Sequence, residues 1–251
     1  MFTVIFLQPF LNLLIGLYNV LPGQDLGIAI IAMTFLVKLI LWPFTALQIK
    51  QQRAMQAIQP KIEEIRTAYK DNKEEQGRKL MELYAKEKVN PASSCLPLLI
   101  QIPVFIGLYR ALSSGLGTID PAMLYGFVRN PGTIHAVFLG IVDLTKSSPV
   151  LAIAAALVQF LQSRQILKST PAAVKAPPSE VADQPAAQDE GMAAIMNKQM
   201  MYTMPILTAF IGFSLPAGLT LYWFVMSVLS VAQQWLIMRS MPPKMVPQLD
   251  K

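Results

Sequence analysis

A single lysine, Lys38, interrupts a long apolar run and is the side chain in this sequence best placed to do chemistry. It is the thirteenth of the 22 residues from Leu26 to Leu47, so a helix over this run places its ammonium group near the middle of a bilayer. A lysine there costs about 2.5–3.5 kcal/mol on insertion scales and usually faces a protein interior or a wet cavity. An internal ion pair is the simpler interpretation, but no acid lies in the middle of any other apolar run. We therefore expect Lys38 to face a water-filled cavity.

Polar side chains on other apolar runs share helix faces and could line the same cavity. Thr34 lies one helical turn from Lys38, and Gln159 shares a face with Gln162. The last run carries a polar stripe at i, i+4, i+7 and i+11, formed by Trp223, Ser227, Ser230 and Gln234. Each could instead make an ordinary interhelical hydrogen bond, worth about 0.6 kcal/mol on average. Three stripes and an unpaired lysine together predict a hydrophilic groove, with these substrate-contacting candidates: Lys38, Thr34, Gln159, Trp223 and Ser227.

The sequence offers little to an enzyme. One cysteine, Cys95, and one histidine, His135, form no cluster that could hold a metal ion. No glycine-rich loop ends in Lys-Ser or Lys-Thr, so nothing indicates nucleotide use. We expect no catalytic residue, no metal and no cofactor. The excess of 21 basic over 15 acidic residues is more typical of topology signals and contact with anionic lipids than of nucleic-acid binding.

Composition predicts an all-α integral membrane protein. Over half of the residues are hydrophobic and 14% are charged, against about 25% in ordinary globular domains. Residues 1–24 predict an amphipathic helix in the membrane interface, with a true span as the alternative. The other expected elements are five spans at 25–48, 95–116, 148–167, 198–215 and 218–239, a helical hairpin in water at 49–92, an extracytoplasmic loop at 117–147, a disordered linker at 168–197 and a short tail at 240–251.

The distribution of basic residues predicts the orientation. Ten of the 21 Lys and Arg residues lie between Lys50 and Lys88, whereas the loop at 117–147 carries only Arg129 and Lys146. By the positive-inside rule, the hairpin, the linker and the C-terminus are cytoplasmic.

Three stretches resemble the YidC/Oxa/Alb family of membrane protein insertases, and the resemblance runs from about residue 8 to residue 239 without the linker. The first is Thr34-Phe-Leu-Val-Lys38 with Pro43 and, in the hairpin, Gln59-Pro60-Lys61. The second is Lys86 to Phe105. The third combines Met204-Pro205, Pro216 to Trp223 and Gln233-Gln234.

The resemblance implies five spans around a groove that is open to the cytoplasm and lipid and closed on the outer side. Lys38 occupies the position of a groove arginine, and Thr34 and Trp223 match groove positions. The hairpin with Gln59, Pro60 and Lys61 matches the family's mobile, substrate-recruiting element. Members insert nascent membrane proteins alone or with the Sec translocon, without nucleotide hydrolysis.

Two departures from the family pattern change the expectations. Lysine replaces arginine, and a desolvated lysine can lose its proton, so the groove must be hydrated for Lys38 to stay charged. The chain has neither the large outer domain of many Gram-negative members nor a long basic tail, so we expect ribosome contact to be weak or transient. With no transit peptide, we expect a bacterial inner membrane.

Two other functions are alternatives. A small-solute transporter would be expected to have inverted repeats or a second charge in the membrane, and the sequence shows neither. A structural subunit leaves Lys38 and the polar hairpin unexplained.

Overall fold

The structure is a computed structural model that describes residues 7–90, 96–113, 121–168 and 202–240. The described chain is helical apart from short turns and the loop at 121–148, which contains one two-stranded ribbon. Residues 169–197 of the predicted linker and 241–251 of the predicted tail lie outside the described residues. Most of the fold therefore rests on how apolar helices pack on one another.

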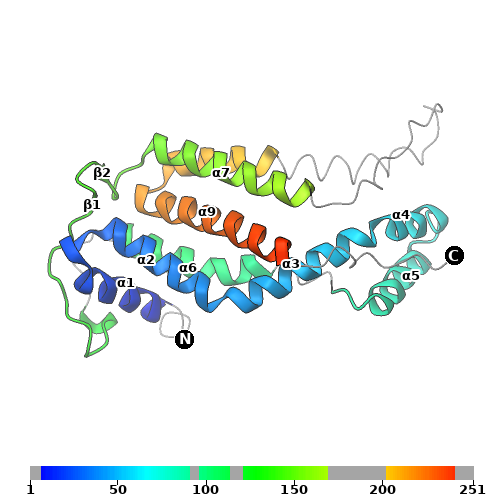
Figure 1. The fold of residues 1–251 in the computed structure, drawn as a ribbon, viewed down its shortest axis with the longest axis horizontal. Coiled ribbons are helices and arrows are strands. Elements are labelled where there is room, and N and C mark those ends of the chain that lie inside the picture. The colour runs from blue at the N-terminus through cyan, green and yellow to red at the C-terminus, as the bar shows by residue number, and fades with distance from the viewer. Residues whose placement is uncertain (1–6, 91–95, 114–120, 169–201, 241–251) are drawn as a thin grey trace.

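Four long helices form the body of the molecule, which are α2 (Leu26–Ile40), α6 (Leu96–Ser113), α7 (Pro149–Lys168) and α9 (Ala217–Ser240). Helix α9 lies between α2 and α7, and α1 (Gln8–Val20) packs on α2 and α6 (Figure 1). An apolar helix at Tyr202–Ser214 precedes α9. The core contains large side chains that are almost fully buried, among them Tyr18, Leu26, Ile30, Met33 and Tyr222.

Helix α2 ends at Ile40, and α3 (Trp42–Ala57) continues at an angle of 64°. Pro43 causes this bend, because it has no N–H and its ring would collide with the carbonyl of Leu39 in a continuous helix. The predicted span at 25–48 therefore contains a sharp bend. Lys38 lies in the last turn of α2, not in the middle of a straight helix.

Helix α3 leads out of the bundle to a helical hairpin of α4 (Gln59–Ala68) and α5 (Lys73–Lys86). Asn72 caps α5, since its side chain accepts a hydrogen bond from the Glu75 N–H at 3.1 Å. The two helices share a small apolar core of their own, formed by Ile58, Ile62, Leu83 and Val89. In Figure 1 this hairpin lies at one end of the bundle.

The ribbon lies at the opposite end, where α2 and α7 begin (Figure 1). It pairs β1 (Val137–Phe138) with β2 (Val142–Asp143) in antiparallel register, with Phe138 opposite Val142. Phe138 and Val142 pack on the core of the bundle. The apolar segment Ile134 to Val142, which is too short to cross a membrane, thus forms a cover on one end of the helices.

Membrane-spanning potential varies among the described helices. Only α9 is long and apolar enough on its own, and α2 with α3 qualifies as a bent pair. The helix Tyr202–Ser214 is apolar but shorter. Helix α7 exposes one apolar stripe, made of Val150, Ile153, Leu157 and Leu161, which suits contact with lipid. The count of five spans stays a prediction.

Candidate functional site

Lys38 reaches from α2 to α9 and binds two neutral oxygen atoms. Its Nζ donates to the Ser230 hydroxyl at 2.8 Å and to Oε1 of Gln233 at 3.3 Å. Ser230 can accept because its own hydroxyl proton goes to the Met226 carbonyl at 2.7 Å. None of the ion pairs among the described residues includes Lys38. Within the described part of the chain, its ammonium group is therefore held by dipoles and not by a carboxylate.

The contact lies far from the ribbon end of the helices. Lys38 follows Leu26 by twelve residues, and Ser230 follows Ala217 by thirteen, which correspond to about 18 and 20 Å along each axis. Both distances are measured from the ribbon end. In a hydrocarbon layer of about 30 Å, the contact would lie beyond the midplane, on the side of the hairpin. Lys38 thus lies near the end of α2 from which α3 departs.

Gln233 is a buried residue of this contact that the polar stripe did not select. Its side chain is 3% exposed, and its Nε2 has no hydrogen-bond partner among the described residues. The predicted stripe follows Ser227, Ser230 and Gln234, whereas Lys38 binds the neighbouring i, i+3 pair of Ser230 and Gln233. The adjacent pair Gln233-Gln234 in an apolar run is the sequence signal that could have identified Gln233. Both side chains are buried in the structure.

Of the other predicted groove residues, Thr34, Ser227 and Trp223 lie on the two helices that Lys38 joins, whereas Gln159 does not. Thr34 and Ser227 are buried on α2 and α9, the two helices that Lys38 joins, and the Thr34 hydroxyl donates to the Ile30 carbonyl of its own helix at 2.6 Å. Trp223 is half-buried and packs edge-to-face on Phe105 of α6, with ring centroids 6.3 Å apart.

Gln159 belongs to a different contact. Its Oε1 accepts a hydrogen bond from Thr208, which joins α7 to the helix Tyr202–Ser214. This is the interhelical hydrogen bond that was weighed as the alternative to a groove role. A similar hydrogen bond joins α6 to α9, where Nε2 of Gln101 donates to the Tyr222 hydroxyl at 2.9 Å.

The hairpin motif begins α4. Gln59 is the first residue of that helix, and Pro60 follows at a position where its missing N–H costs nothing. The Lys61 ammonium forms an ion pair with Glu87 at 2.7 Å, with the two side chains 30% and 16% exposed. Lys61 therefore connects α4 to the end of α5, which is a structural role beside the predicted recruitment role.

Exchanging the two charges separates these roles. We expect Lys61→Glu to loosen the hairpin, because it breaks a partly buried pair worth about 0.5–1 kcal/mol and places two acids together. Adding Glu87→Lys should restore protease resistance of the hairpin, since the pair re-forms in reverse. Activity restored with it would show that Lys61 acts through the fold. Activity still lost would mean that Lys61 contacts another molecule.

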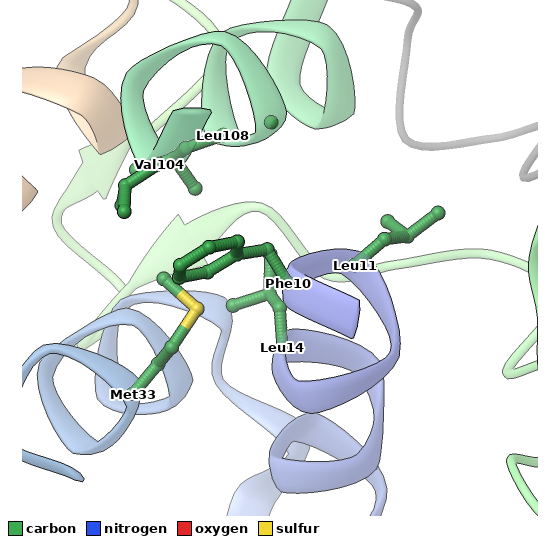
Figure 2. A pocket seen from close by; sticks show the side chains of 7 residues that line it. Phe10, Leu11, Leu14, Met33, Val104 and Leu108 are labelled. Atoms are coloured by element: carbon green, nitrogen blue, oxygen red, sulfur yellow. The ribbon is translucent and has the colours of Figure 1, made fainter. Parts of the chain in front are cut away.

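A small cavity lies between α1, α2 and α6 (Figure 2). Phe10 and Leu14 of α1 face Met33 of α2 and Val104 of α6 across it, and the whole lining is apolar. Its volume of about 10 Å³ is the space of one water molecule. It is a packing gap and has no role in the site.

The ribbon ties α2 to α9 at the end far from Lys38. On the α2 side, the Asp25 carboxylate accepts from the N–H groups of Gly27 at 2.7 Å and Leu139 at 2.7 Å. On the α9 side, the N–H groups of Ala217 and Gly218 donate to the carbonyls of Lys146 at 2.7 Å and Leu144 at 3.0 Å. We name this set of contacts the ribbon clamp, and it includes the Phe138 ring against Gly27.

The sequence is similar to a known family over most of its length. The family described as "60Kd inner membrane protein" matches residues 13–244. The membrane protein insertase YidC of Francisella tularensis subsp. novicida (strain U112) is 34% identical over 215 residues, which are 85% of this chain and 32% of that protein. The YidC proteins of subsp. tularensis (strain SCHU S4 / Schu 4) and subsp. holarctica (strain LVS) match to the same extent. The chain thus spans about a third of the length of these relatives.

Proposed function

Because the chain belongs to the 60Kd inner membrane protein family, the YidC/Oxa family, we propose that it is a membrane protein insertase. It inserts nascent membrane proteins and helps them fold, without hydrolysing a nucleotide. The observation that carries this proposal is Lys38, a cation deep in an apolar bundle whose contacts are to a hydroxyl and an amide oxygen.

The polar groups around Lys38 are suited to receive an acceptor from outside. A lysine ammonium group has three donors, of which Ser230 and Gln233 take two. The buried Nε2 of Gln233 adds further donors without a partner in the described part of the chain. A carboxylate or a peptide carbonyl of a substrate would satisfy both, and leaving buried donors unsatisfied is costly. The polar segment of a nascent protein is thus held while its apolar helix moves into lipid, driven by about 25 cal/mol per Å² of buried apolar surface.

The ribbon clamp supports opening of the α2–α9 contact from one side. At the ribbon end, α2 and α9 are joined through backbone hydrogen bonds and the Asp25 carboxylate. At the other end they are joined by the side chain of Lys38. A hydrophilic groove between the spans would therefore open toward the hairpin and stay closed beyond the ribbon.

With the hairpin and the C-terminus in the cytoplasm, substrates enter the groove from the side on which proteins are made. The hairpin recruits them, the Sec translocon supplies larger ones, ribosome contact is weak, and basic residues near the membrane bind anionic lipid. A bacterial inner membrane fits the family's description.

Depletion of the protein tests the proposal. A small two-span substrate with an acidic outer loop should stay fully sensitive to protease on the cytoplasmic side in depleted cells, and the intact chain should restore the protected fragment. Normal insertion in depleted cells that have no second family member would show that the chain has another function.

A further inference from the structure

The tip of the ribbon is apolar where a turn in water would be polar. The turn from Phe138 to Ile141 closes through a hydrogen bond from the Ile141 N–H to the Phe138 carbonyl at 2.9 Å. Its two central residues have positive φ, 49° at Leu139 and 73° at Gly140. Such turns strongly favour Asn-Gly or Asp-Gly, because a branched apolar residue is strained at positive φ. Leu139 therefore occupies a turn position that its residue type disfavours.

The apolar side chains of the tip lie outside the protein core. Leu139 is 61% exposed and Ile141 is 82% exposed, while Phe138, the last residue of β1 before the tip, packs inward on the bundle. Val150, the second residue of α7, is 77% exposed at the same end of the bundle. It begins the exposed stripe on α7 that continues with Ile153 and Leu157. The apolar tip thus lies at the end of the bundle where this exposed stripe begins.

Two of the three backbone N–H groups of the tip are satisfied within the protein. The Leu139 N–H donates to Asp25 Oδ2 at 2.7 Å, and the Ile141 N–H is used inside the turn. In hydrocarbon such groups must be satisfied internally, whereas a turn in water has no such need. The tip also offers no charged or hydroxyl side chain that a protein partner could recognise.

The base of the ribbon is polar. Asp143 forms an ion pair with Lys146 at 3.1 Å, and the Thr145 hydroxyl hydrogen-bonded to Asp143 lowers the pKa of that carboxyl. The ribbon is joined to the beginning of α9, a helix of 24 residues and hence about 36 Å long. This exceeds the hydrocarbon thickness of about 30 Å, so the ribbon lies at headgroup level if α9 spans the bilayer.

We propose that the ribbon tip, Leu139-Gly140-Ile141, inserts into the outer leaflet of the bilayer as an apolar wedge. Elements that lie in the interface typically reach about 5–10 Å into the boundary between headgroups and acyl chains, a depth open to a turn with a charged base. The wedge fixes the ribbon against lipid while the clamp fixes it against α2 and α9. This inference rests on the predicted orientation, with the bundle across a membrane and the hairpin in the cytoplasm, and does not depend on the insertase function.

Site-specific quenching tests the wedge. Cys95→Ser removes the only cysteine, and Ile141→Cys then takes an environment-sensitive NBD label on the purified full chain in vesicles of phosphatidylethanolamine and phosphatidylglycerol. Leu157→Cys on the exposed stripe of α7 is the lipid control, and Thr133→Cys, an exposed polar position in the same loop, is the water control. We expect doxyl-labelled lipid to quench the label at 141 as it does at 157, and aqueous iodide to quench it at 133 alone.

Other outcomes overturn the proposal. Quenching at 141 by iodide, as at 133, would place the tip in water. Protection from both quenchers would place it against protein, which for the purified chain means a second copy. As a further check, Leu139→Asn with Ile141→Asn suits the turn but should not enter lipid. A label at Val137→Cys should be more accessible to iodide with these two substitutions than without them. Equal accessibility in the two backgrounds would also contradict the wedge.

Discussion

Lys38→Glu should lower the insertion of substrates with an acidic outer segment by at least about tenfold. The substitution replaces the cation between Ser230 and Gln233 with an anion, which repels the segment that the site must hold. Hydrogen bonds to charged groups contribute about 1.5–3 kcal/mol, and about 1.4 kcal/mol corresponds to a factor of ten. Protease protection of the substrate, measured against time in cells that carry only the variant, gives the rate.

Three controls make this result specific to charge capture. Lys38→Arg keeps the positive charge and should retain most of the activity. Lys50→Glu makes the same change of charge at an exposed position of α3 and should have little effect. A substrate whose outer segment is neutral should insert normally with Lys38→Glu, which also shows that the variant is folded. Equal loss for acidic and neutral substrates would contradict the charge-capture step.

The sequence singles out Lys38 but does not show which side chains surround it. One lysine in an apolar run stands out in a single sequence, because the free-energy cost of a lysine in a membrane is large. The prediction of one straight span missed the bend at Pro43, whose effect on the preceding turn ends α2 at Ile40. Helix arithmetic also cannot say which of two adjacent polar stripes faces a neighbour. In the structure, the rotation of α9 about its axis turns Ser230 and Gln233 toward Lys38.

Contacts between distant segments were beyond sequence reasoning. Asp25 caps α2 through Oδ1, and its Oδ2 also accepts a hydrogen bond from the N–H of Leu139, which lies 114 residues away. Likewise, α1 belongs to the amphipathic helix predicted at residues 1–24. Two of its polar side chains, Asn12 and Asn19, donate to the carbonyls of Met123 and Arg129 in the loop after α6. A polar side chain predicts that a partner exists, but not whether that partner is water or backbone.

Gly27→Ala should release the ribbon from α2, since no side chain fits between that helix and Phe138. A methyl group at residue 27 would lie 2.1 Å from Phe138 Cδ2 and 2.5 Å from Cγ, so the ring must leave its place. Overpacking of this kind costs about 1–3 kcal/mol, and alanine returns up to about 1 kcal/mol through its higher helix propensity. We expect a lower unfolding temperature in detergent, by about 2–4 °C for each kcal/mol of net loss, and faster proteolysis of the loop at 121–148.

Gly16→Ala is the matched control, because nothing lies within 4 Å of the methyl group it would add to α1. It should leave the ribbon protected and the stability equal or slightly higher. Adding Phe138→Ala to Gly27→Ala removes the clash, so proteolysis of the loop then reports a ribbon held by Asp25 and the α9 contacts alone. Displacing the ribbon frees α2 from α9 at the ribbon end, so Gly27→Ala should also make the bilayer leak small ions while Gly16→Ala does not. A stable, tight Gly27→Ala protein would mean that the ribbon does not clamp the two helices.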